Sequence, residues 1–142
     1  MKVNKSQAVW KGNLKEGSGQ MSFEHSKISF PYSFKSRFAD GDGANPEMLI
    51  GAAHAGCFSM AFSNMLTEEG FDPKEITTQA EVKLDSTDSG FKIISSHLTV
   101  TADIDDIDEQ TFQRIAKSAK DGCPVSQALA SLEITLEASL KG

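Results

Sequence analysis

The sequence predicts an α+β fold in which antiparallel sheets accompany one long, buried central helix. Residues 45–70 are predicted to form one long helix, in which residues 48–62 are apolar or small on nearly every face, and such a helix must be buried on all sides or cross a membrane. Alternating apolar and polar residues before and after this stretch indicate several strands. A chain of 142 residues with 39% hydrophobic content suits one globular domain over residues 1–142.

The central helix carries start and stop signals at its two ends. Asn45 can cap the first turn, and Pro46 suits the first helical position because its missing N–H would have no partner there. Glu47 places a carboxylate at the positive end of the helix dipole, and Gly70 provides a stop. The apolar run is shorter than the ~20 residues that a bilayer needs, so we expect no membrane span.

The apolar surface of this helix also predicts a dimer. It runs all the way round for roughly 15 residues, or about 22 Å. One small sheet covers one side only, so the opposite side needs a second sheet or a second subunit. We therefore expect an obligate dimer in which the helices pack together.

The residues before the helix predict a small antiparallel sheet. Residues 7–12 and 19–25 alternate like a hairpin around the Gly12-Asn13 break. Residues 28–38 suggest one or two further strands, with Pro31 suited to an edge. The loop 40–44 lacks the ligand spacing of a calcium loop, so we expect no metal there.

The residues after the helix predict two strands, two helices and a last strand. Residues 75–85 and 91–104 alternate like a second antiparallel pair joined by a polar turn. A helix from Asp108 to Gly122 and a short helical piece at 123–129 follow. Residues 132–140 close the chain as a strand.

Charge and composition exclude several classes of partner. The net charge of −6, with both signs interspersed, argues against nucleic acid and anionic membranes. The first twelve residues lack the apolar run of a signal peptide, which predicts a cytoplasmic protein. In that compartment the two cysteines, Cys57 and Cys123, are either inert core thiols or a redox pair.

Two thiols without CxxC spacing suit peroxide reduction better than dithiol exchange with proteins. A thiolate attacks the O–O bond, and a second thiol captures the sulfenic acid before it oxidises further. Cys123 precedes Pro124 at a helix start, where backbone N–H groups stabilise a thiolate. Cys57 lies in mid-helix and therefore needs a fixed positive charge nearby.

Arg37 is the candidate for that charge, because arginine stays charged when buried and can fork between a thiolate and a carboxylate. Glu47 is its natural partner, yet ten residues separate it from Cys57, about 15 Å along a helix. Three roles for Glu47 remain open. It acts in a site completed across the dimer interface, it orients Arg37 from the side away from Cys57, or it only stabilises the N-terminus of the helix. His54, one turn before Cys57, is either a base or proton donor, or a core or interface histidine.

Apolar side chains at helical spacing surround Cys57, and they are either ordinary core or the wall of a site that favours organic hydroperoxides over hydrogen peroxide. They are Phe38, Phe58, Met60, Phe62 and Met65.

The motifs Asn45-Pro46-Glu47 to Cys57-Phe58 and Cys123-Pro124-Val125-Ser126 resemble those of the OsmC/Ohr family of thiol-dependent peroxidases, and the OsmC branch more than the Ohr branch. The resemblance implies an intertwined homodimer with two sites at the subunit interface and the central helix between sheets. It implies that Cys57 is the peroxidatic cysteine, Cys123 the resolving cysteine, and Arg37 and Glu47 the pair that activates the thiolate. It also implies organic hydroperoxides as substrates, dithiol or lipoyl-type reductants, and no haem, flavin or metal cofactor.

Two other readings of the residues remain open. In one, a small dimer binds an apolar ligand or partner between its subunits, and both cysteines are merely packed. In the other, a structural stress protein holds a static disulfide. Helix-terminus reasoning alone favours Cys123 as the more acidic thiol, whereas the resemblance assigns the attack to Cys57.

Overall fold

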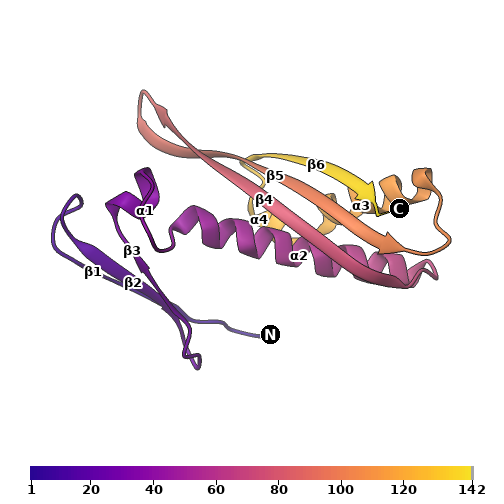
Figure 1. Ribbon diagram of the computed structural model, residues 1–142, viewed down its shortest axis with the longest axis horizontal. Coiled ribbons are helices and arrows are strands. Elements are labelled where there is room, and N and C mark those ends of the chain that lie inside the picture. Colours follow the sequence, from indigo (N-terminus) through magenta and orange to yellow (C-terminus); the bar gives the residue numbers. More distant parts are fainter. Residues whose placement is uncertain (142) are drawn as a thin grey trace. The chain divides into compact units, whose positions relative to one another are not determined.

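The computed structural model describes residues 1–141, which form two compact units. One unit comprises Met1–Leu49, and the other comprises the described residues from Ile50 onward. Each unit contains one three-stranded sheet, and helices accompany both (Figure 1). This confirms the α+β fold class.

The first unit holds an antiparallel meander. Strands β1 (Ser6–Lys11), β2 (Ser18–Phe23) and β3 (Ser29–Tyr32) lie in the order β1-β2-β3, and both neighbouring pairs are antiparallel. The predicted hairpin is therefore confirmed. Pro31 lies in an edge strand, where its missing N–H costs no ladder hydrogen bond.

The prediction of strand beyond Tyr32 was wrong, because α1 (Phe34–Phe38) is a short helix. Ser33 and Ser36 form a capping box: the Ser33 Oγ accepts from the Ser36 N–H at 3.2 Å, and the Ser36 Oγ accepts from the Ser33 N–H at 2.8 Å. Phe34 and Phe38 continue the alternation of the strand, but they are also four residues apart and stack on one helix face with ring centroids at 4.9 Å.

The central helix, α2, spans Pro46–Glu68 and has the predicted ends. The Asn45 Oδ1 accepts a hydrogen bond from the Met48 N–H at 2.8 Å, so one backbone N–H of the first turn that has no partner within the helix is satisfied. Gly70 ends the helix with φ of 91°, a left-handed conformation that favours glycine. The helix therefore carries Glu47 in its first turn and Cys57 near its middle.

The second unit holds a mixed sheet in the order β4-β5-β6, with β4 at Pro73–Thr87, β5 at Gly90–Ile104 and β6 at Glu133–Leu140. β4 and β5 form the predicted antiparallel hairpin. β6, however, runs parallel to β5, so this sheet is not wholly antiparallel. A parallel neighbour needs a long crossover, and α3 (Glu109–Gly122) and α4 (Pro124–Ala128) provide it.

The core of the second unit lies between its helices and its sheet. α2, α3 and β5 contribute most of the fully buried apolar side chains, and the two helices lie along the sheet (Figure 1). α2 passes close to β4 at Gly51, where a Cβ would lie in van der Waals contact with the Val82 side chain at 3.4 Å. The fully buried apolar side chains are Phe58, Phe62, Leu66, Leu98, Val100, Ala102, Phe112, Ile115, Ala116 and Ala119.

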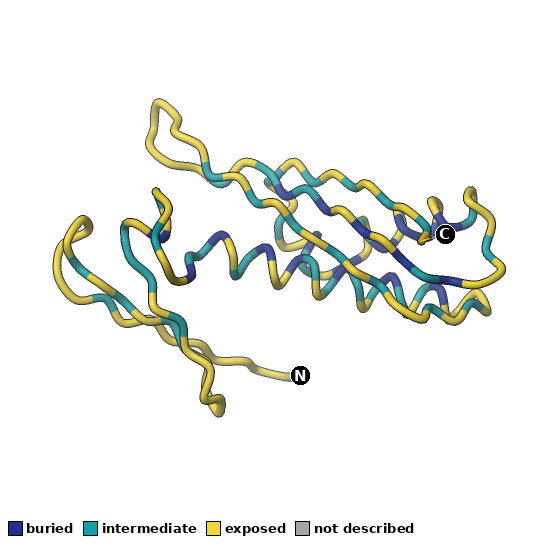
Figure 2. The backbone as a smooth tube through the Cα atoms, in the orientation of Figure 1, coloured by how far each residue is buried: buried dark blue, intermediate teal, exposed yellow. Residues whose placement is uncertain are grey.

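The opposite face of α2 is exposed in the single chain, so buried and exposed positions alternate along the helix (Figure 2). Met48 and Met60 are 57% and 77% exposed, and Ala52, Ala53 and Gly56 are exposed between them. Within residues 1–141, α2 is the one helix long and apolar enough to suit a membrane span. Core helices of soluble proteins have the same length and composition, and the other face of α2 is packed against protein.

Candidate active site

The structure brings the two cysteines together from distant parts of the chain. Cys57 is half-buried on α2, and Cys123 is fully buried where α3 ends and α4 begins. Their Sγ atoms lie 2.9 Å apart, in a thiol–thiol hydrogen bond. A disulfide bond is about 2.05 Å long, so a small movement would join them.

Cys123 lies at a junction that stabilises negative charge. It is both the C-cap of α3 and the N-cap of α4, with Pro124 at the first position of α4. The Ser126 N–H donates to the Cys123 Sγ at 3.4 Å. Burial raises the pKa of the Cys123 thiol, but its hydrogen bonds with Cys57, Ser126 and the backbone of Val125 outweigh this effect, and the pKa lies below its ordinary value.

Cys57 has the opposite tendency. Burial raises the pKa of its thiol, and the hydrogen bond with Cys123 raises it further, against a smaller lowering by the Val125 N–H. Within this pair the negative charge therefore favours Cys123. Attack by Cys57 requires a positive charge in addition to what these neighbours supply.

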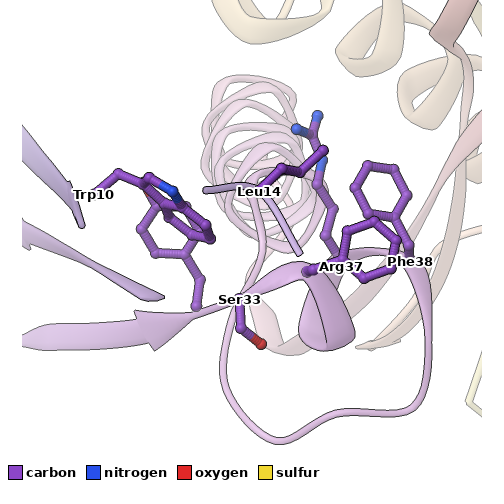
Figure 3. Close-up of a pocket in the computed structure, with 7 residues that line it drawn as sticks. Trp10, Leu14, Ser33, Arg37 and Phe38 are labelled. Carbon is purple, nitrogen blue, oxygen red and sulfur yellow. The ribbon is translucent and has the colours of Figure 1, made fainter. Parts of the chain in front are cut away.

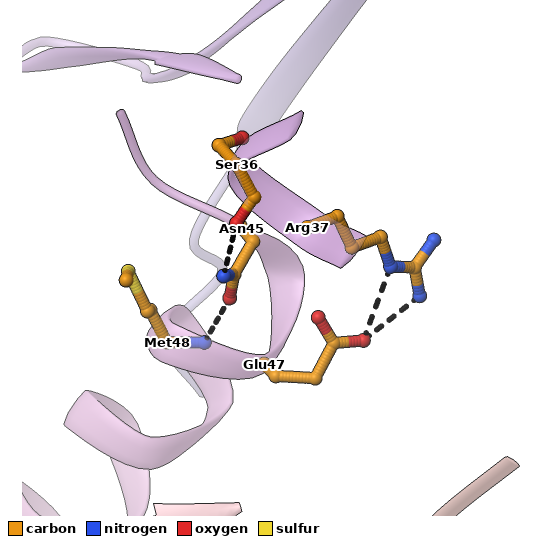
Figure 4. A network of polar contacts seen from close by, with 5 residues as sticks. All are labelled: Ser36, Arg37, Asn45, Glu47 and Met48. Carbon is orange, nitrogen blue, oxygen red and sulfur yellow. Dashed lines mark hydrogen bonds and ion pairs between the residues drawn. The ribbon is translucent and has the colours of Figure 1, made fainter. Parts of the chain in front are cut away.

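The first unit contains a suitable cation on α1. The Arg37 Nη2 and Nε donate to the Oε1 of Glu47 at 2.8 Å and 3.2 Å (Figure 4). Glu47 is buried, and the Arg37 side chain is 36% exposed. A buried carboxylate that holds one edge of a guanidinium fixes its orientation and leaves the remaining N–H groups for another anion.

The loop before α2 is hydrogen-bonded to α1, the helix that carries Arg37. The Asn45 Nδ2 donates to the Ser36 carbonyl oxygen at 2.8 Å, while its Oδ1 caps α2 (Figure 4). The Ser36 hydroxyl donates to the Ala44 carbonyl oxygen at 2.7 Å. α1 and the start of α2 are thus held together, which places Arg37 against Glu47.

Arg37 also lines an aromatic cavity of about 290 Å³ in the first unit. Figure 3 shows Trp10, Leu14 and Phe38 around it, with the Arg37 side chain between them. The Trp10 and Tyr32 rings lie 5.3 Å apart between centroids. The cavity therefore combines apolar walls with one guanidinium, as an apolar molecule with one polar end requires. Its lining residues are Trp10, Leu14, Tyr32, Ser33, Phe34, Arg37 and Phe38.

His54 is fully buried on α2 and hydrogen-bonded at both ring nitrogens. Its Nδ1 lies 2.7 Å from the Ser96 Oγ, and its Nε2 lies 2.8 Å from the Ser126 Oγ. Burial lowers its pKa below the ordinary value, so the imidazole is neutral near pH 7. His54 is therefore connected to the turn that carries Cys123.

The predicted site residues thus occur as two pairs, Arg37 with Glu47 in the first unit and Cys57 with Cys123 in the second. The sequence analysis missed Ser96 and Ser126 as partners of His54. Ser96 could have been noticed, because it is a polar residue on the inward face of a strand that continues with Leu98 and Val100. Among residues 1–141, no group of three or more His, Cys, Asp or Glu side chains could hold a metal ion.

Comparison with known proteins identifies the family. The chain is 50% identical over 138 residues to Peroxiredoxin OsmC of Escherichia coli strain K12, an alignment that covers 96% of each protein. It is 32% identical over 97 residues to organic hydroperoxide resistance protein OhrB of Bacillus subtilis, covering 67% of this chain and 69% of that one.

The structural comparison agrees with the sequence relationships. The crystal structure of OhrB from Bacillus subtilis has a TM-score of 0.72, with 24% identity and coverage of 96% of this chain and 98% of that one, which shows the same fold. The sequence model of the family described as OsmC-like protein matches residues 39–138. With this match and the E. coli relative, the chain belongs to the family of OsmC-like proteins.

Proposed function

We propose that this protein is a thiol-dependent peroxidase that reduces organic hydroperoxides, and hydrogen peroxide more weakly. The observation that carries the proposal is the 2.9 Å separation of the Cys57 and Cys123 sulfurs. The names of two relatives, a peroxiredoxin and an organic hydroperoxide resistance protein, support the same reaction. We further propose that both compact units belong to one domain over residues 1–142 and that the protein acts in the cytoplasm.

The reaction has three balanced steps. The Cys57 thiolate attacks one peroxide oxygen, the O–O bond breaks, and the alkoxide takes a proton to leave as an alcohol, with Cys57 as sulfenic acid. The Cys123 sulfur then attacks the Cys57 sulfur, and the hydroxyl group takes up a proton, in place of the one that Cys123 releases, and leaves as water. A dithiol or lipoyl-type reductant finally reduces the disulfide by thiol–disulfide exchange. None of these steps requires a haem, flavin or metal.

Arg37 is the group that would give Cys57 its thiolate character. Its charge is permanent, and Glu47 already occupies one edge of the guanidinium. Glu47 and Cys57 lie ten residues apart on α2, about 15 Å along a straight helix axis. We therefore assign Arg37 and Glu47 of one subunit to the Cys57 of a second subunit.

The exposed face of α2 supports such a dimer. Met48, Ala52, Ala53, Gly56 and Met60 are exposed in the single chain and form a row of apolar or small residues. Contact between two such faces would remove this apolar surface from water at about 25 cal/mol per Å². Small residues at 52, 53 and 56 would also let two helices approach closely.

The aromatic cavity favours hydroperoxides with an organic substituent. Because Arg37 lines it, a peroxide held near the guanidinium would have Trp10, Tyr32 and Phe34 available for its apolar part. Hydrogen peroxide has no apolar substituent, so it would make none of these contacts with the aromatic side chains and would bind more weakly. The cavity is thus the basis for a preference for organic substrates.

The test is a thiol count after one equivalent of cumene hydroperoxide. The peroxidase should convert two free thiols per subunit into one internal disulfide, seen as the loss of two hydrogens by mass spectrometry, and dithiothreitol should restore both. A dimer that merely binds apolar ligands would keep both thiols free. A structural protein with a static bridge would hold a disulfide that resists dithiol reductants.

A further inference from the structure

A buried polar chain runs from β5 through α2 to the turn that carries Cys123. Ser96 and His54 are fully buried, and Ser126 is 6% exposed. The His54 Nδ1 lies 2.7 Å from the Ser96 Oγ, its Nε2 lies 2.8 Å from the Ser126 Oγ, and the Ser126 N–H donates to the Cys123 Sγ at 3.4 Å. A buried polar chain is costly unless every group is satisfied, so its arrangement is specific.

We propose that His54 is a positioning residue, which aims the Ser126 hydroxyl at the Cys123 sulfur and thereby favours the Cys123 thiolate that resolves the sulfenic acid. The proposal deepens the proposed function, on which its catalytic meaning rests. Cys123 reacts with the sulfenic acid, and His54 acts on it only through Ser126.

The donors and acceptors available allow two directions for this chain, depending on which ring nitrogen of His54 carries the proton, and the proposal takes the one with the proton on Nε2. A neutral imidazole has one N–H donor and one acceptor nitrogen, and each serine hydroxyl has one proton. If the Ser96 hydroxyl donates to Nδ1, then the Nε2–H donates to the Ser126 Oγ. The Ser126 hydroxyl proton is then free to point at Cys123. The same hydroxyl and the Ser126 N–H both lower the pKa of Cys123.

This arrangement assists the second chemical step. Disulfide formation breaks the S–O bond of the Cys57 sulfenic acid, forms the S–S bond and releases water. The Cys123 thiolate, which has already released its proton, is the nucleophile, and the leaving hydroxide takes up a proton from solvent to form water. The backbone N–H of Ser126 donates to that sulfur, and with the proton on the His54 Nε2 the Ser126 hydroxyl is available as a second donor.

Few other charges act on Cys123. Cys57 is the titratable group that faces it from α2, apart from His54 itself. α4 carries no charged side chain. Lys120 and Asp121, the last charged residues of α3, pair with each other at 3.6 Å. Within a single chain, Ser126 is therefore the group whose orientation most affects the Cys123 thiolate, and in the proposed dimer the Arg37 of a second subunit would add its positive charge near both sulfurs.

The test measures the Cys123 thiolate without any turnover. In full-length Cys57→Ser protein, the ultraviolet absorbance of the thiolate is followed against pH, with a Cys57→Ser, Cys123→Ser protein as the blank. Adding Ser126→Ala or His54→Leu should lower the thiolate-to-thiol ratio at a given pH by about tenfold, as expected for loss of a hydrogen bond to a charged group. His54→Gln keeps an N–H near the Nε2 position and should restore most of that ratio.

His97→Gln is the matched control, because His97 lies on β5 next to Ser96 and contacts Thr135 and Glu137. It should leave the titration unchanged. A titration of Ser126→Ala, or of a folded His54→Leu variant, that matches the parent would overturn the proposal, as would a Gln variant as impaired as a folded Leu variant. If His54→Leu does not fold, Ser126→Ala decides.

A second measurement separates this proposal from the proposed function. In protein with both cysteines, His54→Leu or Ser126→Ala should prolong the lifetime of the Cys57 sulfenic acid, detected with a dimedone trap after one equivalent of cumene hydroperoxide. If the parent and its Cys123→Ser variant never form a sulfenic acid, the peroxidase function fails, while the absorbance titration still tests the role of His54.

Discussion

The Arg37 guanidinium holds a single oxygen of Glu47 with two hydrogen bonds, from Nη2 at 2.8 Å and from Nε at 3.2 Å. One carboxylate oxygen thus fixes one edge of the cation, and the other edge keeps its donors. Burying the Glu47 carboxylate at the start of α2 carries a desolvation penalty, which lowers the stability that a purely structural ion pair could provide. We therefore expect the pair to matter more for activity than for stability.

Glu47→Gln and Arg37→Lys should each reduce consumption of cumene hydroperoxide by about tenfold or more, since each loses a charge-assisted or forked contact that orients the cation. The measurement is dithiol-dependent peroxide consumption at neutral pH. Arg114→Lys is the control, because the exposed Arg114 also makes two hydrogen bonds to one carboxylate, that of Glu69, away from the cysteines. Full activity of both site variants would remove Arg37 and Glu47 from the mechanism.

Met60→Glu should dissociate the proposed dimer. Met60 is 77% exposed in the single chain, at the C-terminal end of the apolar row on α2, and a charge there would be buried without a partner in a helix-to-helix interface. Sedimentation velocity should give a dimer for the parent and a monomer for the variant, and peroxide consumption should fall with it. Lys117→Glu on α3 is the charge control. A parent protein that sediments as a monomer would contradict the assignment of Arg37 to a second subunit.

Asn45→Ala should destabilise the fold by about 1–2 kcal/mol, because it removes the cap of α2 and a hydrogen bond to the Ser36 carbonyl oxygen. Urea unfolding measures the loss. Asn64→Ala, which changes an exposed asparagine within the same helix, should cost much less. Equal losses for the two variants would mean that the cap contributes nothing beyond helix propensity.

His54 predicts a pH dependence of stability. Burial lowers its pKa below the value of the unfolded chain, about 6.5, so the unfolded state binds more protons below that pH. The free energy of unfolding should therefore fall between about pH 7 and about pH 5, by up to about 1.4 kcal/mol per pH unit. His54→Gln should flatten this part of the profile. Coincident slopes for the two proteins would show that His54 does not titrate in this range.

Local signals predicted much of the fold. The cap at Asn45, the stop at Gly70 and the alternation on β4 and β5 each have a short-range physical cause, and each prediction was confirmed. The helix at α1 was not predicted, because Phe34 and Phe38 fit both a strand and a helix, and the Ser33–Ser36 capping box decides between them. The parallel pairing of β6 with β5 depends on the path that the chain takes through α3 and α4 back toward the start of β5, and short-range sequence patterns do not reveal that path.

The candidate site was predicted less completely. The cysteine and Arg37–Glu47 residues could be chosen from the chemistry of thiols and carboxylates together with the family resemblance. The serine partners of His54 could not, because Ser96 lies 42 residues away in sequence and Ser126 lies 72 away. Only the packing of β5 and α4 against α2 brings these hydroxyl groups to the imidazole.

The order of the two thiols is the central claim, because the pKa directions within the pair favour charge on Cys123, while the proposal assigns the first attack to Cys57. Single Cys57→Ser and Cys123→Ser proteins, each given one equivalent of cumene hydroperoxide, test it directly. We predict that Cys57→Ser consumes no peroxide and that Cys123→Ser consumes one equivalent and stops as a trapped sulfenic acid. Turnover by Cys57→Ser, with no sulfenic acid in Cys123→Ser, would reverse the assignment.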